Sequence, residues 1–271
     1  MNVMPPRTPA PTDVPAGMHG LAVEEVTHYT DTLFHFRTTR PAGFRFRSGE
    51  FVMIGLPAEG KPLTRAYSIA SPAWDESLAF FSIKVPDGPL TSRLRLIEPG
   101  DTVLMRKKAT GTLVNDALIS GKRLYLLSTG TGIAPFASLI RDPETYEKFD
   151  DVILTQTCRT VAELRFGIEL TAEIRADAML NEVIDTERLT FYPTATREPF
   201  ERTGRITDRI RSGALFTDLG VPPLDPASDR VMICGSMAML RELKSLLDER
   251  GFTEGANNAP GQYVIERAFV D

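Results

Sequence analysis

Leu124-Tyr-Leu-Leu-Ser-Thr-Gly-Thr-Gly-Ile-Ala-Pro135 is the stretch of sequence that most directly indicates the fold. Its apolar first residues predict a buried strand, and Pro135 suits the first turn of a following helix, where its missing N–H costs nothing. The glycines between them would let a phosphate approach the backbone N–H groups at the start of that helix. Because proline replaces the third glycine of the dinucleotide-binding fingerprint, a tight turn without a ligand is the alternative.

Strands alternate with helices after this stretch. Further strands are expected at 152–157, 189–196, 230–234 and 262–267, and helices from about Pro135, at 161–176 and at 237–250. Such alternation is typical of a parallel sheet covered on both faces. A second glycine turn, Cys234-Gly-Ser-Met237, follows one of these strands, so both turns would lie at the carboxyl edge of the sheet, where ligands collect. Cys234 could also be a small buried hydrophobic residue.

The part of the chain before Gly121 has a different pattern. Short strands are expected at 20–29, 32–40, 51–57, 64–70, 78–85 and 102–108, with one helix over 90–97 that Pro99-Gly100 closes. Closely spaced strands with turn residues between them favour an antiparallel barrel or sandwich. Residues 1–16 are rich in proline and predict a flexible tail.

Composition excludes several classes of function. The chain has 271 residues and a formal net charge of -5, which disfavours binding to nucleic acid. Its two cysteines cannot form a disulfide framework or hold an iron–sulfur cluster, and we expect no metal site. The uncharged run from Leu124 to Ile140 is too short and too polar to cross a membrane. With no secretory signal, the cytoplasm is the expected location.

Four sequence blocks, in order along the chain, resemble the ferredoxin–NADP reductases, in particular the bacterial kind. They are Arg65-Ala-Tyr-Ser68, Gly88-Pro-Leu-Thr-Ser-Arg-Leu94, Gly130-Thr-Gly-Ile-Ala-Pro-Phe136 and Cys234-Gly-Ser-Met237. The resemblance covers nearly all of the chain after the tail. It implies a Greek-key β-barrel that binds FAD over 17–117, then an NADP-binding α/β domain over 118–271 whose C-terminal segment returns to the flavin. It also implies a monomer.

The resemblance assigns FAD contacts to the barrel. The arginine matching Arg65 pairs with the FAD pyrophosphate, Tyr67 packs on the flavin ring, and Ser68 hydrogen-bonds flavin N5. The alternative without FAD is that Arg65 forms a surface ion pair, Tyr67 is a core residue and Ser68 is an ordinary strand serine. The pyrophosphate is also expected beside Thr91, which could alternatively serve as a helix cap. The further residues expected to bind FAD are Ala66, Phe81, Lys84, Val85, Pro89, Leu90, Thr131, Ala268 and Phe269.

The resemblance places NADP across the two glycine turns. A 2′-phosphate requires cations, and Arg159, Arg197 and Arg205 match arginines that surround it in related enzymes; the alternative is that each is a solvated surface residue. Arg165 is a weaker candidate. The expected NADP-binding residues are Gly130, Thr131, Gly132, Cys158, Arg159, Thr196, Arg197, Arg205, Cys234, Gly235, Ser236 and Met237.

The carboxyl end departs from the plant-type pattern, in which a terminal tyrosine stacks on the flavin. Ala268 stands at that position, and we hypothesise that Phe269 turns away to cover the FAD adenine. Cys234 and Glu266 are expected to flank the nicotinamide together with Ser68, in a positioning role. The residues expected at the point of hydride transfer are Ser68, Tyr67, Cys234, Glu266 and Ala268.

The implied reaction is hydride transfer between NADPH and flavin N5, then single-electron transfer to ferredoxin or flavodoxin. Basic residues could steer an acidic carrier protein, although such a cluster is usually a solvated surface. The candidates are Arg93, Arg95, Arg106, Lys107 and Lys108. Two alternatives are a stand-alone flavin reductase that serves an oxygenase or haem protein, and an inactive nucleotide-binding module. The intact Arg65-Ala-Tyr-Ser68 block argues against the second.

Overall fold

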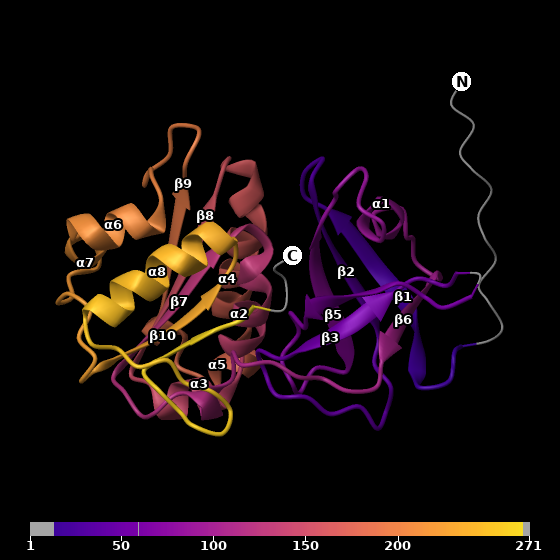
Figure 1. Ribbon diagram of the computed structural model, residues 1–271, viewed down its shortest axis with the longest axis horizontal. Helices are drawn as coiled ribbons and strands as arrows, with labels where there is room; N and C mark the ends of the chain where they lie inside the picture. Colours follow the sequence, from indigo (N-terminus) through magenta and orange to yellow (C-terminus); the bar gives the residue numbers. More distant parts are fainter. Residues whose placement is uncertain (1–13, 59, 268–271) are drawn as a thin grey trace.

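The computed structural model describes residues 14–58 and 60–267, which form two lobes side by side (Figure 1). The first, the barrel lobe, is a six-stranded antiparallel sheet in the order β4-β3-β6-β1-β2-β5. Its strands are β1 (Met18–His28), β2 (Leu33–Thr39), β3 (Phe51–Gly55), β4 (Thr64–Ser68), β5 (Ser77–Ile83) and β6 (Thr102–Arg106). The Ala70 N–H donates to the Ala79 carbonyl oxygen at 2.8 Å and nearly closes the barrel. The expected Greek-key barrel is confirmed, whereas most of the expected tail lies outside the described residues.

The interior of the barrel lobe is filled by large apolar side chains that alternate along its strands. Phe34, Phe36 and Phe80 are completely buried there, and Leu94 of the one-turn helix α1 (Thr91–Leu94) covers one end. The helix expected over 90–97 is therefore shorter than the sequence predicts. After Leu94 the chain continues in a tighter turn, in which the Leu96 N–H donates to the Arg93 carbonyl oxygen.

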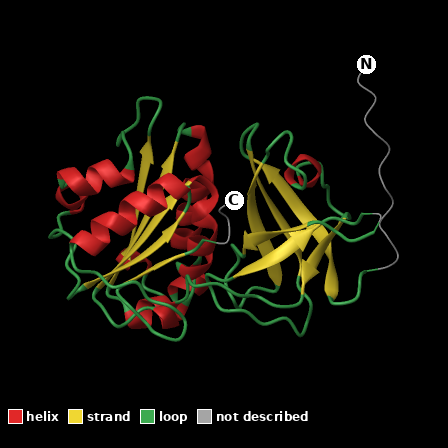
Figure 2. Ribbon diagram, in the orientation of Figure 1, coloured by secondary structure: helices red, strands yellow, loops and turns green. Residues whose placement is uncertain are grey.

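The second lobe, the sheet lobe, is the expected α/β structure (Figure 2). Five parallel strands lie in the order β11-β10-β7-β8-β9. They are β7 (Arg123–Thr129), β8 (Asp151–Cys158), β9 (Leu189–Ala195), β10 (Asp229–Cys234) and β11 (Tyr263–Ile265). The α-helices are α2 (Ala134–Leu139), α3 (Pro143–Lys148), α4 (Arg165–Ala176), α5 (Ala178–Asn181), α6 (Ile206–Ser212), α7 (Ala214–Leu219) and α8 (Met237–Glu249). Short 3₁₀ turns occupy Asn115–Ala117, Gly130–Ile133, Ala162–Leu164 and Thr186–Arg188.

Four of these helices were not predicted from the sequence. They are α3, α5, α6 and α7, each too short to show a clear helical period. Two begin at aspartate caps, because Asp142 accepts from the Glu144 N–H and Asp177 accepts from the N–H groups of Met179 and Leu180. The predicted 161–176 helix begins instead as a 3₁₀ turn and continues as α4.

Side chains of the parallel sheet alternate between two separate cores. Leu124 and Leu126 of β7 pack with α2 and α4, whereas Tyr125 and Leu127 pack with α6, α7 and α8. The first core also contains Leu33, Ala79 and Phe81 of the barrel lobe. Helices α2 and α4 are therefore packed between the sheet and the barrel.

An aromatic cluster joins the lobes at this interface. Phe81 of β5 stacks on Phe166 of α4 with ring centroids 4.3 Å apart, and Tyr29 meets both rings edge-on. His35 lies 5.6 Å from the Phe166 ring. Stacked and edge-on rings add to the stabilisation from apolar burial, so this cluster holds the two lobes in a defined contact.

We expect acidification to loosen this interface through His35. Burial, assisted by the charges of Arg37 and Arg141, lowers the pKa of His35 from 6.5 to about 4. The neutral imidazole therefore contributes stability that is fully present above pH 6.5 and is lost as the pH falls toward 4, with a slope of up to about 1.4 kcal/mol per pH unit. Urea unfolding between pH 7 and pH 4 measures this slope. A His35→Gln variant should lose it, and an equal slope in that variant would contradict the assignment.

Candidate functional site

A cleft of about 1710 Å³ runs between the lobes and is lined by most of the residues predicted to bind cofactors. On the barrel lobe they are Arg65, Ala66, Tyr67, Ser68, Phe81, Lys84, Val85, Pro89 and Thr91. On the sheet lobe they are Gly130, Thr131, Gly132, Cys158, Arg159, Thr196, Arg197, Arg205, Cys234, Gly235 and Ser236.

Besides Arg165, three predicted residues do not line the cleft. Leu90 is buried in the barrel core, and Met237 packs partly buried against the core beneath α8. Glu266 is buried beside Thr112. Ala268 and Phe269 lie outside the described residues, so the hypothesis about Phe269 stays a prediction.

Arg65 presents its guanidinium on the barrel wall of the cleft. Its side chain is exposed, and Nη1 donates to the Thr64 carbonyl oxygen at 3.2 Å. This contact occupies one of five N–H donors, so the planar fork can still reach an anion in the cleft.

Tyr67 and Ser68 follow on the same strand and are both nearly buried. The Tyr67 hydroxyl lies 3.1 Å from Ser82 Oγ, which holds the ring against the cleft wall. Burial raises the pKa of Tyr67, so its hydroxyl stays neutral near pH 7. The pair therefore supplies a flat aromatic surface beside a small hydroxyl group.

The segment between β5 and α1 forms the end of the barrel wall. Lys84 Nζ donates to the Thr30 carbonyl oxygen at 2.7 Å, and Thr91 Oγ1 donates to the Val85 carbonyl oxygen at 3.2 Å. A Cβ at Gly88 would lie 2.2 Å from Thr91 Oγ1 and 3.1 Å from Val85 Cβ, so a larger residue there would displace the Thr91 hydroxyl.

On the sheet lobe, the two glycine turns pack directly against each other. A Cβ at Gly132 would lie 2.2 Å from the Cys234 carbonyl oxygen. Thr129 Oγ1 accepts from the Ser236 N–H at 2.9 Å, and a Cβ at Gly235, whose φ is +152°, would lie 2.2 Å from the same Oγ1. By contrast, a Cβ at Gly130 would meet nothing within 4 Å. The turns thus expose backbone on the cleft side, which fits a phosphate-bearing dinucleotide.

The two cysteines are buried at the ends of strands β8 and β10. Burial raises the pKa of Cys234, and burial together with Glu163 raises the pKa of Cys158 to about 12. Cys158 Sγ donates to the Glu163 carbonyl oxygen at 3.6 Å. Both thiols are neutral near pH 7, so they fit a packing role better than a nucleophilic role.

Three predicted arginines gather on the rim of the sheet lobe. Arg159, Arg197 and Arg205 are all exposed, and the Arg197 N–H donates to the Arg159 carbonyl oxygen at 2.9 Å, which joins the loops after β8 and β9. Arg165 does not line the cleft; its guanidinium pairs with Glu169 at 2.6 Å and lies 5.5 Å from the Tyr29 ring centroid.

Sequence reasoning missed two carboxylates at this rim. Glu163 Oε2 accepts from the Arg159 N–H at 2.8 Å and the Thr160 N–H at 3.1 Å, a capping arrangement that its position at the start of a helical turn could have indicated. Glu242 on α8 lies 3.9 Å from Arg205 and 3.5 Å from Arg211. Nothing local to Glu242 indicates this contact, because it depends on the packing of α8 beside α6.

Glu266 connects the end of β11 to the segment after β6. Its Oε2 accepts from the Thr112 N–H at 3.1 Å, and Thr112 Oγ1 donates to the Ile265 carbonyl oxygen at 2.8 Å. Glu266 Oε1 also accepts from the Arg267 N–H at 2.9 Å. These bonds hold the last described residues of the sheet lobe against the segment that leaves the barrel.

Comparison with known proteins agrees with this geometry. Residues 21–113 match the oxidoreductase FAD-binding domain, and residues 126–245 match the oxidoreductase NAD-binding domain. The chain is 57% identical over 249 residues to the flavodoxin/ferredoxin–NADP reductase of Rhodobacter capsulatus, covering 92% of each chain. The chain belongs to the ferredoxin–NADP reductase family. It is also 54% identical to the ferredoxin–NADP reductase of Pseudomonas aeruginosa, covering 92% of this chain and 96% of that one.

A solved ferredoxin–NADP reductase has the same architecture. The enzyme from Neisseria gonorrhoeae with bound FAD and NADP superposes with a TM-score of 0.84 at 31% identity, covering 94% of this chain and all of that one. Family membership and the two domain models confirm the expected enzyme class, an oxidoreductase that uses FAD and NADP(H). Among the described residues of this family member, no cluster of side chains suits a metal ion and no helix is long and apolar enough to span a bilayer.

Proposed function

We propose that this protein transfers electrons between NADP(H) and a ferredoxin or flavodoxin through FAD. The observation that carries the proposal is the cleft: one wall presents Arg65, Tyr67 and Ser68, and the opposite wall presents two packed glycine turns with an arginine rim. The names of the relatives from Rhodobacter capsulatus and Pseudomonas aeruginosa support the choice of carrier.

On the barrel wall, each residue has a task that its environment allows. Arg65 would pair with the FAD pyrophosphate through its fork, while Tyr67 would support the isoalloxazine ring. Ser68 would orient the ring by hydrogen bonding at N5. FAD bound there would accept two electrons from NADPH as a hydride and release them singly, so the protein's contribution is binding and alignment.

On the sheet wall, the turns at Gly130–Gly132 and Cys234–Ser236 would receive the NADP pyrophosphate and nicotinamide. Arg159, Arg197 and Arg205 would bind the 2′-phosphate, because their side chains are exposed on one rim. Cys234 would pack against the nicotinamide as a neutral group. Glu266 would act through the Thr112 contact by positioning the carboxyl end of the chain.

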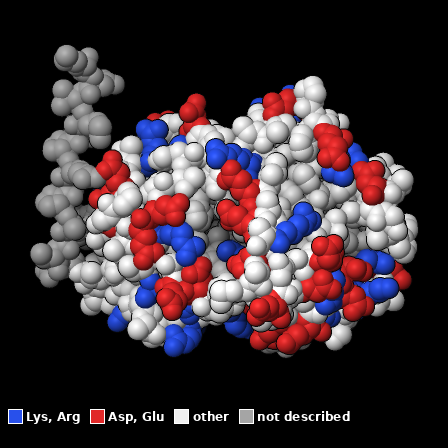
Figure 3. Space-filling view, turned by 180° about the vertical axis from the view of Figure 1, so that it is seen from behind, with Lys and Arg blue, Asp and Glu red and all other residues white. Residues whose placement is uncertain are grey.

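The carrier would dock transiently on a surface with mixed charge. None of Arg93, Arg95, Arg106, Lys107 and Lys108 lines the cleft. Seen from behind, lysine and arginine side chains lie among aspartates and glutamates rather than forming a single basic face (Figure 3). We therefore propose that these cations increase the rate of encounter with an acidic carrier and contribute little to final affinity.

The protein would act as a cytoplasmic monomer.

The proposed domain division follows the notable change of architecture along the chain. The FAD-binding domain would span 17–117 and the NADP-binding domain 118–271, with 1–16 as a tail. The 3₁₀ turn Asn115–Ala117 comes between β6 and β7 and so lies close to the proposed boundary.

Anaerobic stopped-flow reduction with NADPH and NADH in parallel tests the proposal. The purified protein should be yellow, NADPH should reduce the flavin much faster than NADH, and cytochrome c reduction should require added ferredoxin or flavodoxin. Carrier-independent transfer to free flavin would favour a stand-alone flavin reductase. A colourless protein that cannot be reconstituted with FAD would contradict any redox function.

A smaller effect is expected from Glu242, whose carboxylate lies where it would compete with a 2′-phosphate for Arg205. A Glu242→Gln variant should bind NADPH about threefold more tightly, because an exposed ion pair of this kind is worth only a fraction of a kcal/mol to about 1 kcal/mol. Titration of the protein with NADPH and NADH measures the effect, which should be absent for NADH. Glu249→Gln on the same helix is the control. Weaker NADPH binding by the Glu242 variant would contradict the competition.

A further inference from the structure

We infer that Arg141 and Trp74 form a latch between the lobes that sets the distance between the FAD and NADP sites. The inference rests on the proposed function, since it assigns positioning residues for that reaction. Neither residue lines the cleft, so both would act through the elements they connect.

The latch consists of two reciprocal hydrogen bonds. Arg141, just after α2 on the sheet lobe, donates from Nη2 to the carbonyl oxygen of Ala70 on the barrel lobe at 2.5 Å. In the opposite direction, Trp74 Nε1 of the barrel lobe donates to the Arg141 carbonyl oxygen at 3.0 Å. Arg141 Nε also donates to the Ala137 carbonyl oxygen at 2.8 Å, which fixes the side chain to the end of α2.

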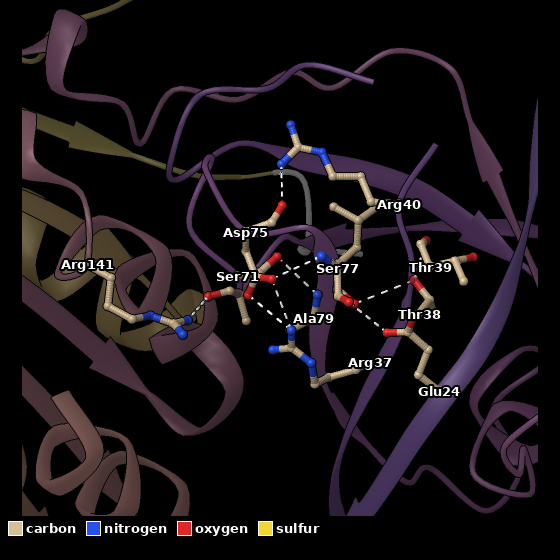
Figure 4. Close-up of polar contacts among 12 residues, drawn as sticks. Glu24, Arg37, Thr38, Thr39, Arg40, Ser71, Asp75, Ser77, Ala79 and Arg141 are labelled. Atoms are coloured by element: carbon tan, nitrogen blue, oxygen red, sulfur yellow. Dashed lines mark hydrogen bonds and ion pairs between the residues drawn. The ribbon is translucent and has the colours of Figure 1, made fainter. Parts of the chain in front are cut away.

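The barrel side of the latch is a firmly held loop, residues 69–76 between β4 and β5. Arg37 Nη2 contacts both carboxylate oxygens of Asp75 at 3.1 Å, and Arg40 Nη1 donates to the carbonyl oxygens of Ala73 and Asp75. Ser71 Oγ accepts from the Ala79 N–H. Figure 4 shows these side chains converging on the loop, with Arg141 approaching it from the other lobe. A loop anchored at so many points can transmit a displacement of Arg141 instead of absorbing it.

Each end of the latch is directly connected to one half of the cleft. Ala70 lies two residues beyond Ser68, the last residue of β4, and β4 lines the barrel wall of the cleft. Helix α2, whose carboxyl end Arg141 holds, begins at Ala134 immediately after the turn Gly130–Ile133. A shift of α2 relative to the loop would therefore move the nicotinamide site relative to the flavin site.

Stability alone does not account for an arginine at this position. Desolvation lowers the pKa of Arg141 to about 10, although the charges of Asp75 and Glu173 offset part of this effect. Among the described residues no carboxylate lies within ion-pair distance of the guanidinium, and the nearby Asp75 pairs with Arg37. The half-buried guanidinium donates instead to the carbonyl oxygens of Ala70 and Ala137. A well-packed apolar residue is often equally stable or more stable at such a site, so what the guanidinium adds is a directional link between the lobes.

The FAD-loaded Arg141→Met and Trp74→Phe variants test the latch. Arg188→Met is the matched control, because Arg188 also donates to backbone carbonyl oxygens, of Tyr146 and Asp150, but within one lobe. Three quantities are measured: the NADPH dissociation constant, the rate constant of flavin reduction at saturating NADPH, and the long-wavelength absorbance that appears when nicotinamide stacks on flavin at saturating NADP⁺.

Both latch variants should retain FAD and bind NADPH within about twofold of the unmodified protein. Their reduction rate constant and stacking absorbance should fall, the rate constant by about tenfold, since small misplacements of reacting atoms cost up to about 10²-fold. The control should change neither quantity. If both latch variants match the control, the inference is overturned; if the unmodified protein itself is not reduced by NADPH, the proposed function fails instead. Should Arg141→Met not fold, Trp74→Phe decides alone.

Discussion

Replacing both Arg197 and Arg205 by alanine is expected to lower the preference for NADPH over NADH by about 10²-fold or more. Charge-assisted hydrogen bonds from arginine to a phosphate are each worth about 1.5–3 kcal/mol, and NADH lacks the 2′-phosphate that would receive them. The double variant should therefore lose affinity for NADPH and keep almost all of its affinity for NADH. The two single variants should each show a smaller effect.

The preference is measured as the ratio of the two nucleotide dissociation constants and of the two values of kcat/KM. Arg165→Ala is the matched control, because this arginine lies on the same lobe and pairs with Glu169 outside the cleft. The control should leave the ratio unchanged. Equal use of NADH by the unmodified protein, or an unchanged ratio in the double variant, would show that the arginine rim does not bind a 2′-phosphate.

The long periodic elements could be predicted from the sequence because their patterns are local. The strand at Leu124–Leu127 is apolar on both faces, and the structure places it in the middle of the parallel sheet with a separate core on each side. By contrast, α6 and α7 have six or seven residues each and end at Gly213 and Gly220. So short a helix shows at most two turns of periodicity, and its stability comes from packing that the sequence does not display.

The residues of the cleft could be predicted because they fall in compact blocks. Arg65–Ser68 is a single strand, and each glycine turn is a single strand-to-helix junction, so one motif brings several lining residues together. Contacts between distant segments have no such signal. Arg141 and Ala70 are 71 positions apart, and Thr112 and Glu266 are 154 apart. Only the packing of the two lobes brings these pairs together.

Leu90 shows that neighbouring residues of one motif can face opposite ways. The block Gly88–Leu94 reaches the cleft, yet within it Pro89 and Thr91 line the cleft while Leu90 turns into the barrel core. The hydrophobic side chain is buried because α1 must cover the end of the barrel. Contact between Leu90 and FAD would therefore have to come from its backbone.

The sharpest test of the flavin site is Arg65→Ala, which should weaken FAD binding by about 50-fold. The guanidinium is exposed on the cleft wall, and its one hydrogen bond to a described residue goes to the Thr64 carbonyl oxygen, so its removal should not unfold the barrel. What is lost is a bidentate partner for the pyrophosphate. The FAD affinity of Arg65→Lys should lie between those of the unmodified protein and Arg65→Ala, because lysine keeps the charge but not the planar fork.

FAD affinity is measured by titrating the apoprotein with FAD and following the change in flavin fluorescence. Arg45→Ala is the control, since Arg45 is an exposed barrel arginine that donates to the carbonyl oxygens of Ala42 and Phe44 and does not line the cleft. If Arg65→Ala keeps full FAD affinity, the pyrophosphate does not lie against β4. The flavin would then have to be held chiefly by Tyr67, Ser68 and the segment that leads into α1. The position of the flavin relative to the nicotinamide would have to be derived from those contacts instead.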